Sequence, residues 1–188
     1  MLVTHHKEKA YNAITFFVNN TSTCNKKKLY KLLYILDFEH FEQTGRSVTG
    51  FDYFAWKMGP VPTELHEAIE YEDPELREYF EIENVPMPTG YFDAVCLKNK
   101  VEFDEKLFSQ RELQLMKSVA ERFYDSSGKD LEDFTHRKGS PWFRVWEEEQ
   151  NRQKEIPYEY ALSHLDDEDK ELIVEIAKER EAILANYR

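Results

Sequence analysis

Apolar residues recur at helical spacing along most of this chain. In the segment from about Asn25 to Gln43 they fall at i, i+3, i+4, i+7 and i+11, which predicts a helix with one buried face. These positions are Leu29, Leu32, Leu33, Leu36 and His40. A shorter helix with similar spacing is predicted at about residues 7–19, and Gly45 ends the second helix. The chain is therefore expected to begin as a pair of helices.

Polar residues that cap helices mark where further helices begin. The predicted starts are Thr63, Asp73 before Pro74, Ser109 in a capping box with Glu112, Ser127, and Ser140 before Pro141. The helix after Asp73 is expected to bury Leu76, Tyr79 and Phe80. The last helix is predicted at about residues 166–187, and it also carries one apolar face. That face is made of Ile173, Ile176, Ala177, Ile183 and Leu184.

Extended structure is predicted in two places. The segment 48–58, VTGFDYFAWKM, is rich in aromatic and β-branched residues, and Gly59-Pro60 is expected to end it. After a loop at 85–90, two short strands are expected on either side of residues 98–100. A single strand pair is marginally stable by itself and must pack on helices. These patterns predict a mainly α, compact multi-helix domain with one small antiparallel β-sheet, made of a β-hairpin or of three short strands.

Length and composition are typical of one folded domain over residues 1–188. The residues are 41% hydrophobic and 14% aromatic, which is enough to form a core. The N-terminal segment has no long apolar run, so we expect neither a signal peptide nor a membrane span, and a cytoplasmic location follows. Cys24 and Cys96 form no Cys-x-x-Cys pair, so cysteine alone provides no zinc site. A reducing compartment also disfavours a disulfide between them.

The formal net charge of −12 limits the classes of partner that the chain is expected to bind. An acidic chain repels phosphate, so direct binding to nucleic acid or to an anionic membrane surface is not expected. Acidic residues concentrate in the stretches 70–83, 146–150 and 165–171. These stretches are either solvated helix faces or a negative surface that steers a basic partner, and the sequence leaves both interpretations open.

Candidate chemical groups are few and scattered. The candidate metal ligands are His5, His6, Asp37, Glu39, His40, Glu64 and His66. No His-Glu-x-x-His signature is present, and His40 also continues the apolar stripe, so no metal site is predicted. His136 beside an indole suggests a general base, but no nucleophile stands in a fixed relation to it and no Gly-rich phosphate loop occurs. We therefore predict no catalytic residue and no cofactor.

The stretch YFAWKMGPVPTEL, residues 53–65, places large side chains beside the sharpest break in the chain. Trp56 is expected to anchor a corner between a strand and a helix, because glycine permits unusual backbone conformations and proline fixes the exit direction. Met58 shares the strand face of Trp56, so at least partial burial of both is expected. Trp and Met are also frequent in interfaces. A partner-binding edge is therefore predicted at Trp56, Lys57, Met58, Gly59, Pro60 and Val61.

Three segments together resemble the Panacea domain family. They are KLLYILDFEHFEQTG at 31–45, FDYFAWKMGPVPTELHEAI at 51–69 and FSQRELQLMKSVAERFYDSSGKDLEDFTHRKGSPWFRVW at 108–146. In the last segment, Thr135, His136, Pro141 and Trp142 occupy positions of the family pattern, and we expect all four to be structural. The segments stand in the family's order, which implies a single Panacea-like domain with its core at about 7–157.

The Panacea family is best known for the antitoxins of bacterial and phage toxin–antitoxin pairs. The resemblance implies that this chain binds and neutralises a toxic protein that an adjacent gene encodes. A basic toxin is expected if the acidic stretches serve to steer the partner. SocA-like relatives imply an alternative, an adaptor that delivers the toxin to a cytoplasmic protease. A phage or prophage accessory interaction protein is a further hypothesis, and an enzyme using His136 ranks last. Some relatives carry a DNA-binding domain, for which we expect no room before the first helix at about residue 7.

Overall fold

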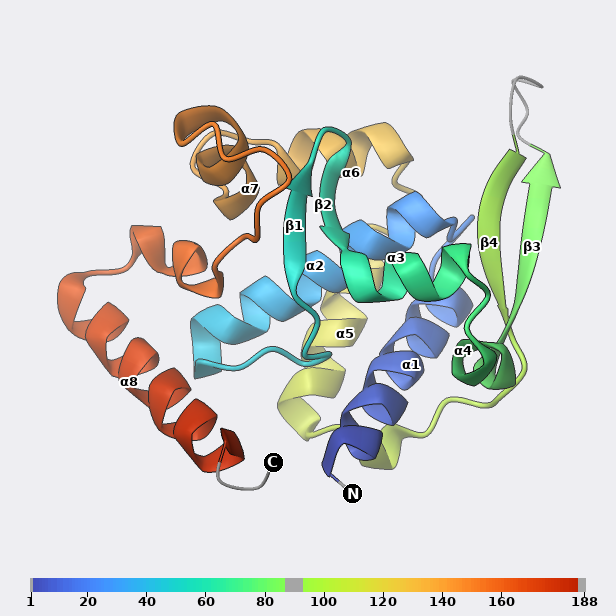
Figure 1. Cartoon of the computed structure of the whole chain (residues 1–188), viewed down its shortest axis with the longest axis horizontal. Coiled ribbons are helices and arrows are strands. Elements are labelled where there is room, and N and C mark those ends of the chain that lie inside the picture. Colours follow the sequence, from blue (N-terminus) through green and yellow to red (C-terminus); the bar gives the residue numbers. More distant parts are fainter. Residues whose placement is uncertain (1, 87–92, 186–188) are drawn as a thin grey trace.

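The computed structural model describes residues 2–86 and 93–185, and it is mainly helical, as predicted. Helix α2 (Lys26–Thr44) lies at the centre and contacts α1 (Leu2–Asn20) and α5 (Gln110–Arg122) (Figure 1). The remaining helices are α3 (Thr63–Glu70), α4 (Pro74–Tyr79), α6 (Gly128–Thr135), α7 (Pro141–Phe143) and α8 (Asp167–Ala185), with the short turns η1 (Glu105–Leu107), η2 (Arg144–Glu148) and η3 (Tyr158–His164).

Helix α2 is buried on nearly all sides. Between Lys28 and Phe41, only Glu39 is not buried, because α1, α5, α6, η3 and the strand β2 (Gly59–Pro62) all pack against this helix. Such a helix forms the core of a fold instead of one wall of it. Its predicted buried stripe, His40 included, is confirmed. The predicted end is also confirmed, since Gly45 follows in the left-handed conformation with φ of 66° and donates its N–H to the carbonyl of Phe41.

Helix α8 crosses the C-terminal end of α2 at Gly45. A Cβ atom on Gly45 would lie 2.8 Å from the carbonyl oxygen of Ile173, so only glycine permits this close approach. The predicted inner residues Ile173, Ile176 and Ala177 are half-buried there. Ile183 was expected on the same face, but its side chain is 57% exposed because α8 runs along the edge of the molecule beyond this crossing (Figure 1). The side chain of Leu184 lies outside the described residues.

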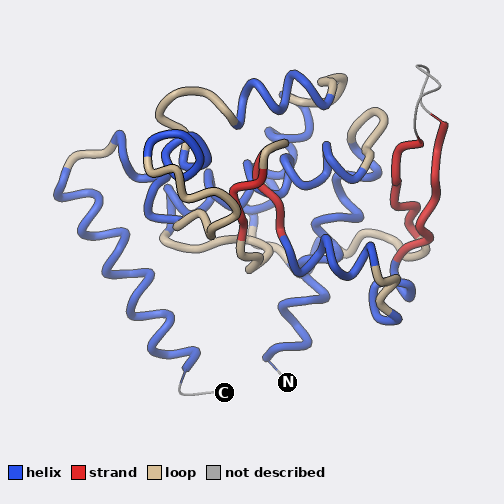
Figure 2. Tube along the Cα trace, turned by 45° about the horizontal axis from the view of Figure 1, so that its top comes forward, coloured by secondary structure: helices blue, strands red, loops and turns tan. Residues whose placement is uncertain are grey.

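The strands form two separate antiparallel pairs instead of one sheet (Figure 2). Strand β1 (Tyr53–Trp56) pairs with β2 (Gly59–Pro62), and β3 (Phe80–Pro86) pairs with β4 (Asp93–Asn99). The expectation that Gly59-Pro60 ends the first strand was wrong, since these residues begin β2. The chain reverses at Lys57 and Met58, which form a two-residue turn between the paired residues Trp56 and Gly59.

The predicted strand pair around residues 98–100 was also wrong. Strand β4 ends at Asn99 and pairs back with Phe80, the first residue of β3. Phe80 had been assigned to the helix before it, but α4 ends at Tyr79 and the Phe80 ring packs edge-on against Tyr11 of α1. Contacts with distant residues thus override the local helical spacing. Of the predicted loop, residues 85 and 86 belong to β3, and residues 87–90 lie outside the described part of the chain.

Most predicted helix caps are confirmed. Side-chain oxygens accept backbone N–H bonds at the N-termini of α4, α5, α6 and α7. The residues are Asp73, Ser109, Ser127 and Ser140. Thr63 was wrongly predicted as a cap, because it is already the first residue of α3 and Pro62 precedes it without a side-chain bond.

Candidate functional site

The hairpin β1–β2 carries all six residues of the predicted partner-binding edge. Gly59, Pro60 and Val61 are buried against α2 and α6, and Trp56 is half-buried. The side chain of Met58 is 47% exposed, and that of Lys57 is exposed as well, because both stand at the turn instead of on a strand face. The turn is therefore accessible to a partner, whereas the other residues of the predicted edge pack against the helices and hold the turn in place.

Two of the four residues of the predicted structural motif, His136 and Trp142, lie against this hairpin. Trp142 donates its indole N–H to the backbone carbonyl of Trp56 at 2.9 Å. The imidazole of His136 stacks flat on the Trp142 ring, with 3.5 Å between centroids and 2° between planes. Two segments 86 residues apart in the chain thus meet at one point. These contacts favour the structural interpretation of His136 and Trp142.

Serine and threonine side chains hold the segment between α6 and α7 in this position. Ser140 donates its hydroxyl to the carbonyl of Thr135 at 2.7 Å and accepts the N–H of Phe143 at 3.1 Å. The Thr135 hydroxyl donates to the carbonyl of Leu131. Pro141 occupies the first helical position of α7. Together with these bonds, it fixes the backbone that carries His136 and Trp142.

Lys31 on α2 completes this site, although its sequence position did not suggest it. Only 3% of Lys31 is exposed, and burial lowers the pKa of its ammonium group to about 8. A Cβ atom on Gly59 would lie 3.3 Å from Lys31 Nζ and 3.4 Å from His136 Nε2, so both nitrogens border the same glycine. Hydrophobic spacing misses such a residue because lysine is scored as polar. We refer to Lys31, Trp56, Gly59, His136 and Trp142 as the motif cluster.

The motif cluster is poorly suited to acid–base catalysis. His136 Nε2 is buried and has no hydrogen-bond partner among the described residues, and burial lowers the pKa of this imidazole. A general base must lie within reach of a substrate proton. The neighbouring cavity is lined by Thr135 and Arg137 but not by His136. The geometry therefore favours a packing role for His136 over a chemical one.

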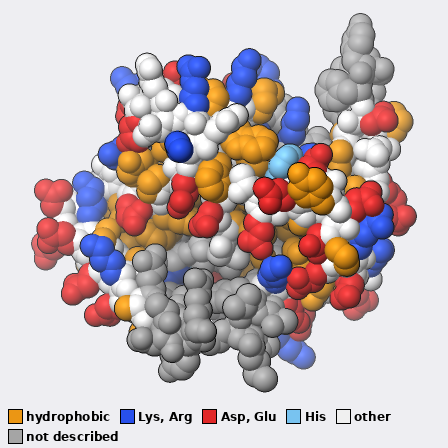
Figure 3. Space-filling view, viewed as in Figure 1, with side chains coloured by type: hydrophobic (Ala, Val, Ile, Leu, Met, Phe, Trp, Pro, Cys, Tyr) orange, Lys and Arg blue, Asp and Glu red, His pale blue; other side chains and the backbone are white. Residues whose placement is uncertain are grey.

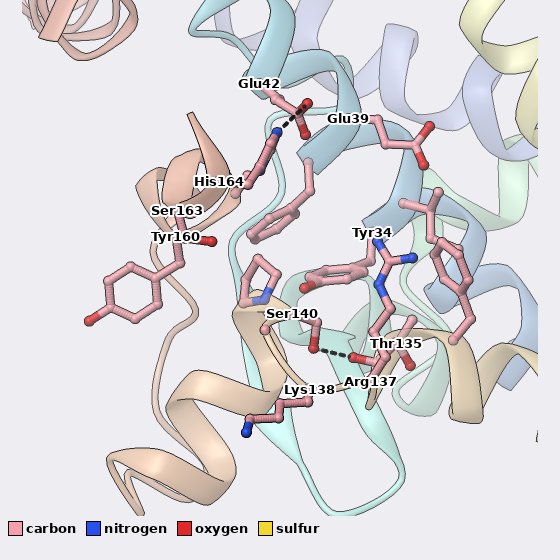
Figure 4. Close-up of a pocket in the computed structure, with 16 residues that line it drawn as sticks. Tyr34, Glu39, Glu42, Thr135, Arg137, Lys138, Ser140, Tyr160, Ser163 and His164 are labelled. Carbon is pink, nitrogen blue, oxygen red and sulfur yellow. Dashed lines mark hydrogen bonds and ion pairs between the residues drawn. The ribbon is translucent and has the colours of Figure 1, made fainter. Parts of the chain in front are cut away.

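That neighbouring cavity lies between α2, the α6–α7 segment and η3, with a volume of about 250 Å³ (Figure 4). Aromatic side chains form much of its wall, including Tyr34, Phe38 and Phe134. The rings of Tyr34 and Phe38 lie 4.2 Å apart. Arg137 and Lys138 stand at its edge. We refer to this space as the Tyr34 cavity.

The candidate metal ligands are engaged in other interactions. Buried Asp37 accepts the N–H groups of Val48 and Thr49 at 2.7 and 2.8 Å, the Tyr53 hydroxyl at 2.6 Å and the Thr49 hydroxyl. Burial raises the pKa of Asp37 to about 6 although these four bonds lower it. Asp37 thus ties α2 to the start of β1. His40 contacts the carbonyl of Arg46 at 2.7 Å.

The other candidates are spread over the surface. Glu39 pairs with Arg122, Glu64 lies 3.9 Å from Lys7, and His66 contacts the rings of Trp56 and Tyr30. The side chains of His5 and His6 lie outside the described residues. Among the side chains that the structure describes, no three potential ligands gather around a point. Cys24 and Cys96 are both free thiols.

The predicted acidic stretches lie at the periphery. Acidic side chains gather over the start of α8 and over the α3–α4 region, on opposite ends of the face seen in Figure 3. Between them, hydrophobic side chains gather around the β1–β2 hairpin on the same face. Of the helices described here, none combines the length and the apolar character needed to cross a membrane.

Comparison with known protein families identifies the family of this chain. The family of antitoxins described as SocA-like, with the Panacea domain, matches residues 29–143, which is more than half of the chain. The chain belongs to this family. The match runs from α2 to α7, so the whole motif cluster lies within the Panacea domain, whereas η3 and α8 lie outside the matched span. Neither the curated proteins nor the solved structures give a match.

Proposed function

We propose that this Panacea protein is an antitoxin that binds a toxic protein encoded by an adjacent gene and blocks it by direct contact. The observation that carries the proposal is the family match over residues 29–143. The mechanism is stoichiometric, since the toxin's working surface is covered and no bond is made or broken. The protein then needs no cofactor, and it acts where the toxin is made, in the cytoplasm.

The exposed turn of the β1–β2 hairpin is the proposed first contact. Lys57 and Met58 project from a hairpin that the motif cluster holds rigid, and a rigid surface loses little conformational entropy on binding. Acidic side chains at the two ends of the same face give that face a negative field (Figure 3). Such a field accelerates association with a basic toxin and disfavours nucleic acid as a direct partner.

Co-expression with the product of the adjacent gene tests the proposal. Restored growth together with a complex that co-purifies is the expected result. Restored growth with no complex, but with a falling amount of toxin, would replace direct blocking with delivery to a cytoplasmic protease. A harmless neighbour that does not bind would refute the antitoxin proposal.

A variant of the turn tests the contact surface. Met58→Arg places a positive charge opposite a basic toxin, and we expect the affinity measured by calorimetry to fall about tenfold. Leu172→Arg is the matched control, because Leu172 is a similarly exposed apolar residue on α8, away from the hairpin. Equal affinities for the two variants would remove the hairpin turn from the interface while leaving the antitoxin function intact.

A further inference from the structure

We propose that the Tyr34 cavity receives a carboxylate-bearing segment of the toxin, with an apolar side chain inside the cavity and the carboxylate at its edge. This inference rests on the antitoxin function proposed above. It adds a second contact on a different part of the surface from the hairpin turn, and it states which chemistry the toxin presents there.

The two acidic residues of the cavity, Glu39 and Glu42, already interact with other side chains. Arg122 holds the carboxylate of Glu39 with two hydrogen bonds of 2.8 and 2.9 Å. His164 lies 3.1 Å from the carboxylate of Glu42, as Figure 4 shows. Arg122 therefore balances the charge of Glu39, whereas His164 balances the charge of Glu42 only when its imidazole is protonated. The Glu39 carboxylate thus adds little repulsion toward an incoming negative group.

The two cations at the cavity edge are not neutralised. Arg137 and Lys138 are exposed, and neither takes part in an ion pair with any residue that the structure describes. The guanidinium of Arg137 lies 4.2 Å from the centre of the Phe134 ring, which fixes it beside the cavity. An arginine held in this way can bind a carboxylate through two parallel N–H bonds.

The size of the cavity favours a side chain over a free small molecule. Pockets for drug-sized ligands span about 300–1,000 Å³. The Tyr34 cavity measures about 250 Å³ and has an aromatic wall, which suits one anchoring apolar side chain. Because the whole chain carries a formal charge of −12, most of its surface repels an acidic segment. Binding at this positive edge would therefore be specific in place and orientation.

Residues from two parts of the chain line the cavity. Tyr34, Phe134 and Arg137 lie within the span matched by the Panacea family, whereas Tyr160 and His164 of η3 lie beyond it. A partner seated in the cavity would contact both the family's domain and a segment outside the matched span. The cavity is thus placed to distinguish one toxin from another.

The test measures the affinity of purified variants for the purified product of the adjacent gene by isothermal titration calorimetry. Arg137→Glu with Lys138→Glu reverses both edge charges, and we expect binding to weaken tenfold or more. Lys106→Glu with Arg111→Glu is the matched control: it reverses one exposed lysine in η1 and one exposed arginine at the start of α5, and it changes the net charge equally. The control is expected to bind within about twofold of the wild type.

A second variant tests the cavity itself. Ser163 is exposed on η3 at the cavity wall, so Ser163→Trp fills the space without removing a buried group, and we again expect at least tenfold weaker binding. Unchanged binding in either the charge-reversal or the filled variant would overturn this inference but not the antitoxin function. A wild-type chain that fails to bind would refute the antitoxin function, and the inference with it. Thermal melting of each variant checks that it is folded.

Discussion

The two hairpins of this protein have the same topology but opposite relations to the core. In β1–β2, with four residues per strand, every residue of β2 is buried, and Trp142 and Lys31 lie directly beneath. The strands of β3–β4 have seven residues each, yet only Phe80 and Leu97 are buried. Figures 1 and 2 show this second hairpin projecting from the helices.

This difference shows that packing against the helices, more than the number of paired residues, sets how firmly a hairpin is held. A two-stranded hairpin is marginal in water unless one face is covered by other elements. The shorter hairpin is covered by α2 and α6, whereas the longer one is anchored at its base. We therefore expect changes in or under β1–β2 to affect the stability of the whole domain, and changes at the far end of β3–β4 to have little effect.

Among the changes that test this comparison, the removal of Asp37 is expected to reduce the stability of the domain most. Asp37→Ala leaves two N–H groups and two hydroxyls without their acceptor at the start of β1, so we expect the free energy of unfolding to fall by about 3–5 kcal/mol. Chemical denaturation measures this loss. Asp52→Ala, at an exposed position in the same segment, is the control and should change stability by less than about 0.5 kcal/mol. A loss below about 1 kcal/mol for Asp37→Ala would show that the network does not anchor the hairpin.

A methyl group at Gly59 tests the close contact between β2 and the motif cluster. Gly59 has φ of 115°, and its Cβ would lie 3.1 Å from Lys31 Cε, so Gly59→Ala should destabilise the fold by about 1–3 kcal/mol. Gly139→Ala is the matched control, since Gly139 also has positive φ, 85°, but no atom within 4 Å of its Cβ position. If both variants lose the same stability in denaturant titrations, backbone strain alone accounts for the effect and the contact contributes nothing.

The smallest expected effects come from one valine in each hairpin. Val61 of β2 is 8% exposed, and Val61→Ala should cost about 1–2 kcal/mol through lost packing. Val85 of β3 is 41% exposed, and Val85→Ala should cost less than about 0.5 kcal/mol. The pair makes the same chemical change in both hairpins, so the shift in thermal midpoint compares them directly. Equal shifts would contradict the difference in anchoring described here.

The candidate site was only partly predictable from the sequence. The stretch around Trp56 and the positions of His136 and Trp142 were both recognisable, but their contact was not, because a hydrogen bond between segments so distant in the chain leaves no local pattern. Lys31 was missed for a related reason. Its burial follows from the placement of α6 and β2 against α2, and neither placement is encoded in the spacing around Lys31.

The sequence by itself determined the helices of this protein, because helix formation depends on neighbours within one or two turns. The stripe along α2, the capping box at Ser109 and the stop at Gly45 are all local signals, and each has its predicted structure. Only the tertiary structure decided the strands, since the partner of Phe80 is Asn99 and that of Tyr53 is Pro62, on the far side of a turn. The tertiary structure likewise decided that Arg137 and Lys138 stand beside the Tyr34 cavity without an ion pair to any described residue, because pairing and burial depend on segments that meet only in the fold.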